Sequence, residues 1–251
     1  MLYNKIMKRI LLTVQYDGTN YYGWQKQPNV KTIQGEIENA FFVATGQNIE
    51  VFGSGRTDAG VHALHQTAHF DLSVPISEEK IAQILNDHLP PDIVITNAKE
   101  VDGDFHARFS IKKKTYLYKI HSSKDKFAFE AYHFGFIKQP LDEEKMREVA
   151  KLLIGTHDFK GFCSSQTSAT DFTRTIYDIS VERVDENNIN IFVTGSGFLY
   201  NMVRIIVGTM VDYSLGKVTL DQINDALGNG NRSSAGRTMP ASGLYLYNTE
   251  Y

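Results

Sequence analysis

The sequence contains very little cysteine and no long apolar run. Cys163 is the single cysteine among 251 residues, so an internal disulfide is impossible and a disulfide-stapled secreted scaffold is excluded. The longest apolar stretch, residues 205–211, ends at Asp212 and is too short to span a bilayer. Near the amino end, residues 10–14 are too few for the apolar region of a signal peptide, and no cleavage site follows. We therefore expect a cytoplasmic protein without a membrane partner.

Glycine and proline are too scarce for a collagen-like or low-complexity chain, at 19 and 6 residues. Hydrophobic residues make up 42% and charged residues 22% of the chain, which excludes intrinsic disorder. A chain of 251 residues has room for one large domain or two modest ones. The composition therefore predicts a folded globular protein with a substantial core.

The chain also lacks a large net charge, but its charges are segregated. With 26 basic and 29 acidic residues, the net charge is −3. Residues 1–31 carry five Lys/Arg and one Asp, and residues 105–126 carry seven Lys/Arg and one Asp. Residues 71–104, by contrast, carry eight acidic and two basic residues. This distribution is compatible with one basic face that binds phosphates, and ordinary solvated charge clusters explain it equally well.

The hydrophobic pattern of the first half predicts the element order βαββαβ. One helix is expected between its cap Thr32 and Gly46, and a second between Ser77 and Pro90. Strands are expected around these helices, at residues 9–16, 49–52, 65–72 and 93–101.

The second half repeats this order with insertions. Strands are expected at residues 115–121, 175–184, 189–194 and 244–247, and helices at residues 141–154, 201–215 and 219–227. Since βαββαβ is the ferredoxin-like order, we predict an α+β fold of two duplicated halves, residues 1–108 and 109–251.

The densest chemistry lies in the glycine-rich loop of residues 53–63, between two predicted strands. It is not a dinucleotide-binding motif, because Asp58 occupies the third glycine position and no helix follows. It is not a nucleophile elbow either, because Ser54 is flanked at the outer positions by Phe52 and Arg56. What remains is an aspartate two positions from an arginine. Either Asp58 is an ionised carboxylate that attacks or abstracts a proton, or the Asp58–Arg56 pair braces a turn.

Seven motifs, in order, resemble those of the tRNA pseudouridine synthase A family. They are Tyr16-Asp17-Gly18-Thr19 with Gly23-Trp24-Gln25, Gly55-Arg56-Thr57-Asp58-Ala59-Gly60-Val61-His62, Asp104-Phe105-His106-Ala107-Arg108-Phe109-Ser110, Tyr116-x-Tyr118, Gly155-Thr156-His157-Asp158-Phe159, Met202-Val203-Arg204-x-Ile206-Val207-Gly208 and Ala241-x-Gly243-Leu244-Tyr245-Leu246. The resemblance covers almost the whole chain. Residues 1–6 extend beyond the usual start of the family, so Met7 is an alternative initiator.

The resemblance implies an isomerase that converts uridine to pseudouridine at positions 38, 39 and 40 of the tRNA anticodon stem-loop, without metal or organic cofactor. It implies two ferredoxin-like halves joined into one extended, mostly antiparallel sheet flanked by helices, with the active-site cleft between the halves. Relatives act as homodimers on tRNA, so tRNA and a second copy are the expected partners; DNA is not.

The resemblance also assigns site residues. Asp58 matches the catalytic aspartate, Arg204 the arginine that pairs with this carboxylate, and Arg56 the arginine that helps to extract the nucleotide from the stem. Tyr116 matches the tyrosine that stacks on the target base, and Leu244 an apolar residue of the pocket. For Arg204, a charged side chain at a helix end is the structural alternative.

Several other residues and two other functions are weaker candidates. His62, His65 and His69 form a histidine run, but no cysteine lies nearby and we expect no metal site. Tyr118 is expected to pack the pocket wall as a core aromatic residue, and Cys163 to be a buried thiol. The alternative functions are a non-catalytic RNA-binding module and an N-glycosylase-type hydrolase that attacks the same bond.

Overall fold

The computed structural model describes residues 7–126, 128–167 and 169–251. The segment of residues 1–6, including the alternative start at Met1, lies outside the described residues. By its internal contacts the described chain divides into two compact units, residues 7–112 with 246–251, and residues 113–245. Each unit is described by itself.

The first unit has the element order βαββαβ. Its elements are β1 (Lys8–Tyr16), α1 (Ile33–Thr45), β2 (Phe52–Gly53), β3 (His62–Leu72), α2 (Glu78–Asn86) and β4 (Ile93–Val101), joined by residues 246–250 of β10 (Leu244–Glu250). Strand β1 pairs antiparallel with both β3 and β4. The ring of Phe41 on α1 meets that of Phe70 on β3 edge to face at 5.4 Å between centroids, which places α1 against the sheet.

The second unit is richer in helix. Its strands are β5 (Lys113–Ser122), β6 (Gly135–Ile137), β7 (Gly155–Asp158), β8 (Thr173–Arg183) and β9 (Asn188–Gly195). Its α-helices are α3 (Glu143–Leu153), α4 (Met202–Ser214) and α5 (Leu220–Gly228), and its short 3-10 helices are η1 (Ala128–Glu130), η2 (Lys160–Phe162), η3 (Arg232–Ser234) and η4 (Ala241–Gly243). Helix α3 packs on α4 and on β8.

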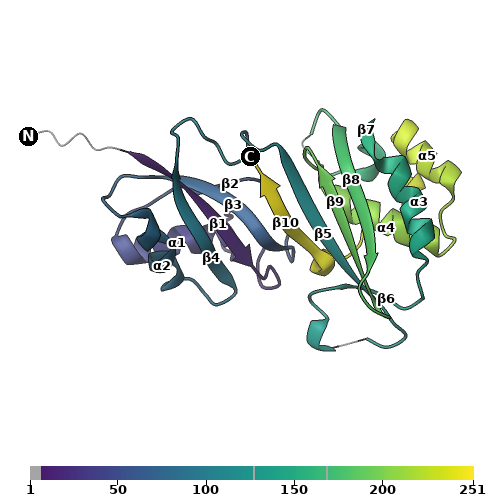
Figure 1. Cartoon of the computed structure of the whole chain (residues 1–251), viewed down its shortest axis with the longest axis horizontal. Helices are drawn as coiled ribbons and strands as arrows, with labels where there is room; N and C mark the ends of the chain where they lie inside the picture. The colour runs from purple at the N-terminus through teal and green to yellow at the C-terminus, as the bar shows by residue number, and fades with distance from the viewer. Residues whose placement is uncertain (1–6, 127, 168) are drawn as a thin grey trace, which may run out of the picture. The chain divides into compact units, whose positions relative to one another are not determined.

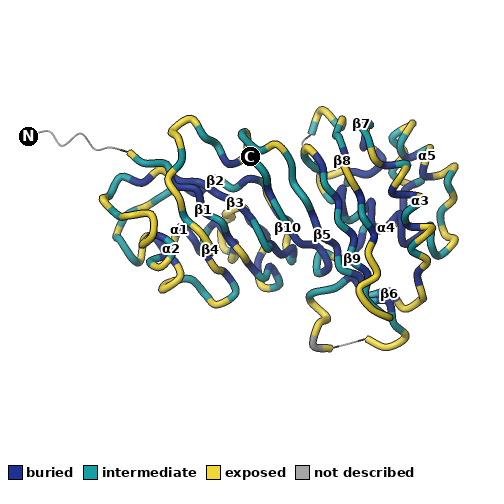
Figure 2. Tube along the Cα trace, viewed as in Figure 1, coloured by how far each residue is buried: buried dark blue, intermediate teal, exposed yellow. Residues whose placement is uncertain are grey.

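The strands belong to one mixed, mostly antiparallel sheet of an α+β fold. Ten strands of the described chain follow the order β4-β1-β3-β10-β5-β9-β8-β7, with β2 beside β3 and β6 beside β5 (Figure 1). The pairing of β6 with β5 is parallel, which makes the sheet mixed. Burial follows the sheet and α4, because the alternating residues of β9 and ten of the thirteen residues of α4 are buried (Figure 2).

The predicted helices and most predicted strands are confirmed, with three differences. The predicted strand at 49–52 is wrong, because β2 contains only Phe52 and Gly53, the two residues that find partners on β3. Strands β6 and β7 were not predicted. Both are short, and they exist only because they pair with β5 and β8.

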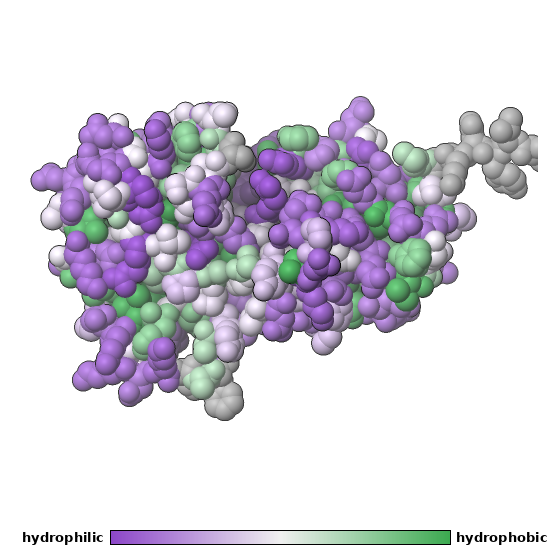
Figure 3. All heavy atoms as spheres, turned by 180° about the vertical axis from the view of Figure 1, so that it is seen from behind, coloured by the Kyte–Doolittle hydropathy of each residue, from purple (hydrophilic) through white to green (hydrophobic). Residues whose placement is uncertain are grey.

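The distribution of apolar groups on the surface agrees with the composition of a folded globular protein. Apolar groups are scattered among hydrophilic ones on the face turned away from the viewer of Figure 1 (Figure 3). Across the described ranges, no helix combines the length and the apolar composition needed to cross a membrane.

Candidate active site

The loop that carries Asp58 joins β2 to β3 and is anchored to the segment that follows β1. The backbone N–H of Trp24 donates to the carbonyl of Thr57 at 3.0 Å. The hydroxyls of Tyr16 and Thr57 are hydrogen-bonded at 2.8 Å, and the N–H of Val61 donates to the Asp58 carbonyl at 3.2 Å. Thr57 and Val61, which form these contacts before and after Asp58, are both buried, so the backbone of Asp58 is held on both sides.

Two glycines explain why the Tyr16 motif accompanies the Asp58 motif. A Cβ on Gly18 would lie 1.9 Å from the carbonyl oxygen of Val61. Gly23 has a φ of 83° and lies so close to the loop that a Cβ would be 2.4 Å from the Thr57 oxygen. Only glycine allows the two chain segments to approach this closely.

A second set of contacts holds the amino-terminal side of the loop. The Ser54 hydroxyl donates to Oε1 of Gln66 at 2.6 Å, and Nε2 of Gln66 donates to the Gly55 carbonyl at 2.9 Å. The indole of Trp24 covers Gly53, where a Cβ would lie 2.5 Å from Nε1. The loop is therefore held at Gly53, Gly55 and Thr57, before Asp58 is reached.

Asp58 and Arg56 have different surroundings within this loop. Asp58 is half-buried, whereas Arg56 is exposed. Within residues 7–126, 128–167 and 169–251, the Arg56 side chain forms no hydrogen bond or ion pair. The interpretation of Arg56 and Asp58 as a pair that braces the turn is therefore not supported. An exposed guanidinium on a fixed loop is suited to contact an anionic ligand.

Arg204 lies at the third position of α4, in the second unit. Its Nε donates to the Met239 carbonyl at 2.6 Å, and its Nη1 donates to Oδ1 of Asn201 at 2.7 Å. Asn201 itself has a left-handed backbone, with φ of 61°. These two bonds fix the plane of the half-buried guanidinium, so Arg204 is not a freely solvated side chain at a helix end.

Tyr116 and Tyr118 lie on β5. The Tyr116 ring is 9% exposed and meets the ring of Phe198 edge to face at 5.2 Å. Tyr118 is completely buried, as expected of a core residue, and donates from its hydroxyl to the Pro240 carbonyl at 2.8 Å. Burial raises the pKa of Tyr118, and the positive charge of Arg204 opposes this rise.

Leu244 is the first residue of β10 and is 6% exposed. Gly243 precedes it and lies flat against Tyr118, since a Cβ there would be 2.6 Å from the ring carbon Cζ. The small residue before Leu244 is therefore required by the packing of β5. The structure thus brings Arg56 and Asp58 together in the first unit, and it holds Tyr116, Arg204 and Leu244 in the second.

The three histidines of the predicted run have separate partners. Nδ1 of His62 accepts from Gly18 N–H at 3.1 Å and lies 3.1 Å from Oδ1 of Asp17. Nδ1 of His69 accepts from Ala107 N–H at 3.2 Å, and Nδ1 of His65 lies 3.5 Å from the Thr249 hydroxyl. Each ring is thus engaged with its own neighbour on the polypeptide.

Cys163 is buried, as expected, and burial raises the pKa of its thiol. A thiol of this kind is a weak nucleophile, since only the thiolate attacks. Cys163 is therefore not a candidate for the site.

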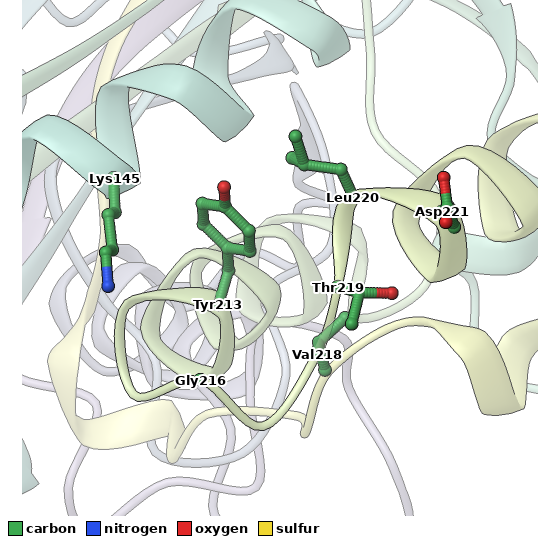
Figure 4. A pocket seen from close by; sticks show the side chains of 7 residues that line it. All are labelled: Lys145, Tyr213, Gly216, Val218, Thr219, Leu220 and Asp221. Atoms are coloured by element: carbon green, nitrogen blue, oxygen red, sulfur yellow. The ribbon is translucent and has the colours of Figure 1, made fainter.

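A separate pocket opens beside α4. It is lined by residues of α3, of the end of α4 and of the segment that leads into α5: Lys145, Tyr213, Gly216, Val218, Thr219, Leu220 and Asp221 (Figure 4). Tyr213 is nine residues after Arg204 on the same helix, which is roughly 13 Å along its axis. The pocket is therefore at the opposite end of α4 from the guanidinium.

The sequence matches a protein-family model described as tRNA pseudouridine synthase over residues 12–110 and 149–251. The chain is 44% identical over 245 residues to "tRNA pseudouridine synthase A" of Thermoanaerobacter sp. (strain X514), covering 98% of this chain and 100% of the relative. It is 45% identical over 245 residues to the protein of the same name from Acetivibrio thermocellus, with the same coverage. Among solved structures, an archaeal box H/ACA sRNP Nop10–Cbf5 complex aligns with a TM-score of 0.37 and 14% identity, over 93% of this chain and 46% of that one.

Proposed function

Because this chain belongs to the tRNA pseudouridine synthase A family, we propose that it isomerises uridine to pseudouridine in the tRNA anticodon stem-loop, at positions 38, 39 and 40. The observation that carries the proposal is the identity of 44–45% over the full length of relatives with this name. The anchored Asp58 loop supports it, because the reaction needs a carboxylate held at a fixed position.

Asp58 is the proposed catalytic residue. The reaction breaks the bond between ribose and uracil N1, turns the detached base and rejoins it through C5. An ionised Asp58 either attacks the ribose or removes a ribose proton to give a glycal-like intermediate. Both routes need the negative charge, and the proposed role of Arg204 is to stabilise that charge by pairing with Asp58. The two hydrogen bonds that fix its guanidinium suit this role.

The remaining site residues are proposed to extract, bind and shield the target base. Arg56 helps to draw the nucleotide out of the stem, which costs a few kcal/mol of lost stacking and pairing. Tyr116 stacks on the target uracil, and such stacking is worth about 1–3 kcal/mol without a base-specific hydrogen bond. Its contact with Phe198 gives the ring a defined position in the absence of a base. Leu244 lines the pocket and helps to exclude water from the detached uracil.

We extend the proposal to the organisation of the enzyme. The proposed ferredoxin-like halves are residues 1–108, with the Asp58 loop, and residues 109–251, with Tyr116 and the Arg204 helix, and the active-site cleft is proposed to lie between them. The enzyme acts in the cytoplasm as a homodimer and uses no metal or organic cofactor. The supporting observation is the βαββαβ order of the first unit.

One assay tests the function directly. Unmodified tRNA labelled with tritium at C5 of uracil is incubated with the protein, tritium release is measured, and modified positions are mapped. Tritium leaves C5 when this carbon bonds to the ribose, so release with intact tRNA is expected. Asp58→Asn should lower the rate by at least about 10⁴-fold while tRNA binding persists.

The same assay separates the alternatives. An Asp58→Asn variant with undiminished activity contradicts a catalytic role for this carboxylate. Binding of tRNA without any tritium release indicates a non-catalytic RNA-binding module. Free labelled uracil in the supernatant indicates an N-glycosylase that admits water to the same bond.

A further inference from the structure

The guanidinium of Arg204 is held by a segment outside the motif that contains Arg204. Residues 236–240 run without regular structure between η3 and η4, and we call them the strap. Met239 of the strap contacts Arg204 twice. Its carbonyl accepts from Nε at 2.6 Å, and its N–H donates to the Arg204 carbonyl at 3.2 Å. The strap therefore helps to orient the guanidinium, together with Asn201.

An ion pair attaches the strap to the later part of α4. Asp212 lies eight residues after Arg204 on this helix, and its side chain is only 7% exposed. Its carboxylate accepts from the Arg237 N–H at 2.9 Å, from Nε at 2.8 Å and from Nη2. A carboxylate removed from water needs such a partner, because an unpaired buried charge costs several kcal/mol. Arg237 is thereby fixed through both its backbone and its side chain.

The other strap residues are fixed as well. The Gly236 N–H donates to the Thr209 hydroxyl of α4 at 2.9 Å. Arg232 donates to the Gly236 carbonyl at 2.9 Å and to the Thr238 hydroxyl at 3.0 Å. The Tyr118 hydroxyl donates to the Pro240 carbonyl at 2.8 Å.

The strap packs closely against α4 at Gly208 and Gly236. A Cβ on Gly208 of α4 would lie 1.8 Å from the Arg237 carbonyl oxygen, and a Cβ on Gly236 would lie 2.5 Å from Cα of Thr209. The strap and the helix are in direct backbone contact. A change at Asp212 is therefore passed to Met239 rather than absorbed by a gap.

We propose that Asp212 and Arg237 are positioning residues of the reaction, because their ion pair fixes the strap and the strap fixes the guanidinium of Arg204. This inference rests on the proposed function, in which Arg204 stabilises the charge of Asp58. Neither Asp212 nor Arg237 has to touch the tRNA. Their effect is on the alignment of a group that acts in the chemical step.

The test uses Asp212→Asn in the full-length protein. Asparagine retains the shape and an acceptor oxygen, and the Arg237 side chain is 41% exposed, so the charge left behind stays solvated. We expect kcat for tRNA to fall by roughly tenfold or more, since small misplacements of a catalytic group are costly. The KM for tRNA should change by less than about twofold, because uniform binding is not altered.

A pH profile separates positioning from simple loss of structure. In the proposed mechanism Arg204 stabilises the ionised carboxylate of Asp58, so a misaligned guanidinium should favour the protonated acid and move the acidic limb of kcat to higher pH. Glu143→Gln is the matched control. Glu143 on α3 forms an ion pair with Arg183 on β8. The Glu143→Gln variant therefore breaks an ion pair of the same unit that does not hold the strap. It should leave kcat, KM and the pH profile unchanged.

A second variant keeps the test decisive if Asp212→Asn does not fold. Tyr118→Phe removes the hydroxyl that holds Pro240, and it should lower kcat in the same way with a smaller change. An unchanged kcat per folded enzyme and an unmoved acidic limb in Asp212→Asn, or in Tyr118→Phe where Asp212→Asn does not fold, overturn the inference. Failure of the parent protein to form pseudouridine overturns the proposed function instead, so the two failures are distinguishable.

Discussion

Gly18 shows why a motif about forty residues before Asp58 belongs to the same site. Its Cα faces the carbonyl of Val61 at the end of the Asp58 loop, and its N–H donates to Nδ1 of His62. The resemblance identified both motifs but gave no reason for their association. The reason is steric and depends on the folded chain, since no sequence pattern reports how closely two backbones approach.

Gly18→Ala should therefore destabilise the protein by about 1–3 kcal/mol, because a backbone carbonyl cannot move aside as a side chain does. Because the displaced residues follow Asp58, activity per folded enzyme should also fall. Urea unfolding and the tritium assay measure the two effects. Gly103→Ala is the control, since a Cβ at Gly103 has nothing within 4 Å and should change neither quantity.

His69 gives a prediction about pH and stability. Its Nδ1 accepts from Ala107 N–H, which requires the neutral imidazole, and burial, followed by the charges of His106 and Arg9, lowers its pKa from 6.5 to about 4. Asp71 opposes this shift, and its own pKa is lowered by Arg9. Since the unfolded chain takes up the proton first, stability falls as the pH falls from about 6.5 towards 4.

The loss between pH 7 and pH 4 should approach about 3 kcal/mol for this group. His69→Asn offers an acceptor oxygen near the place of Nδ1 and does not titrate. Urea midpoints across this pH range should therefore decline less steeply in the variant than in the parent. Equal slopes would show that folding does not lower the pKa of His69.

Helix α1 was the most predictable element because its signals are local. The side chain of Thr32 accepts from Gly35 N–H at 3.3 Å at its start, and Gly46 ends it with a left-handed φ of 70°. Strands β2, β6 and β7 have no such signals. Gly135 of β6 lies against the Tyr118 ring, where a Cβ would be 2.4 Å from the hydroxyl, so this strand depends on a contact that the sequence order does not reveal.

Thr32→Ala should lower the free energy of unfolding by about 1 kcal/mol, because the Gly35 N–H loses its acceptor at the helix start. Thr32→Ser keeps the hydroxyl and should lose much less. Thermal unfolding followed by circular dichroism measures both variants. If Thr32→Ala and Thr32→Ser are equally stable in thermal unfolding, the Thr32 hydroxyl does not cap α1.

At the scale of the whole molecule, hydrophobic periodicity predicted the α+β class and a duplicated βαββαβ order, whereas the seven motifs predicted the function. The pattern along the chain did not indicate that residues 246–251 pack with the first unit. This packing results from the position of β10 beside β3, two strands that are far apart in the sequence. The roles of Asp58, Arg56, Tyr116 and Leu244 likewise depend on a bound nucleotide, so they stay predictions that the assays above address.

Tyr251 provides the test of that long-range packing. Its hydroxyl donates to the Ala107 carbonyl at 2.9 Å and is 2.6 Å from the Thr67 hydroxyl, and its ring lies 4.7 Å from that of Phe105. Tyr251→Ala removes all three contacts and should destabilise the first unit by about 2 kcal/mol, less than a fully buried aromatic residue would lose. Burial also raises the pKa of Tyr251 to about 12, as expected of a partly buried phenol.

The readout is the fluorescence of Trp24, the single tryptophan of the chain, which is 2% exposed within the first unit. Its urea midpoint should fall in Tyr251→Ala. Tyr177→Ala, at a half-exposed tyrosine of the second unit, should change the free energy of unfolding by less than about 0.5 kcal/mol. Equal midpoints for Tyr251→Ala and the parent would mean that the contacts of Tyr251 contribute nothing to the stability of the first unit. Trp24 reports on the part of this unit that holds the Asp58 loop, because its N–H is hydrogen-bonded to that loop.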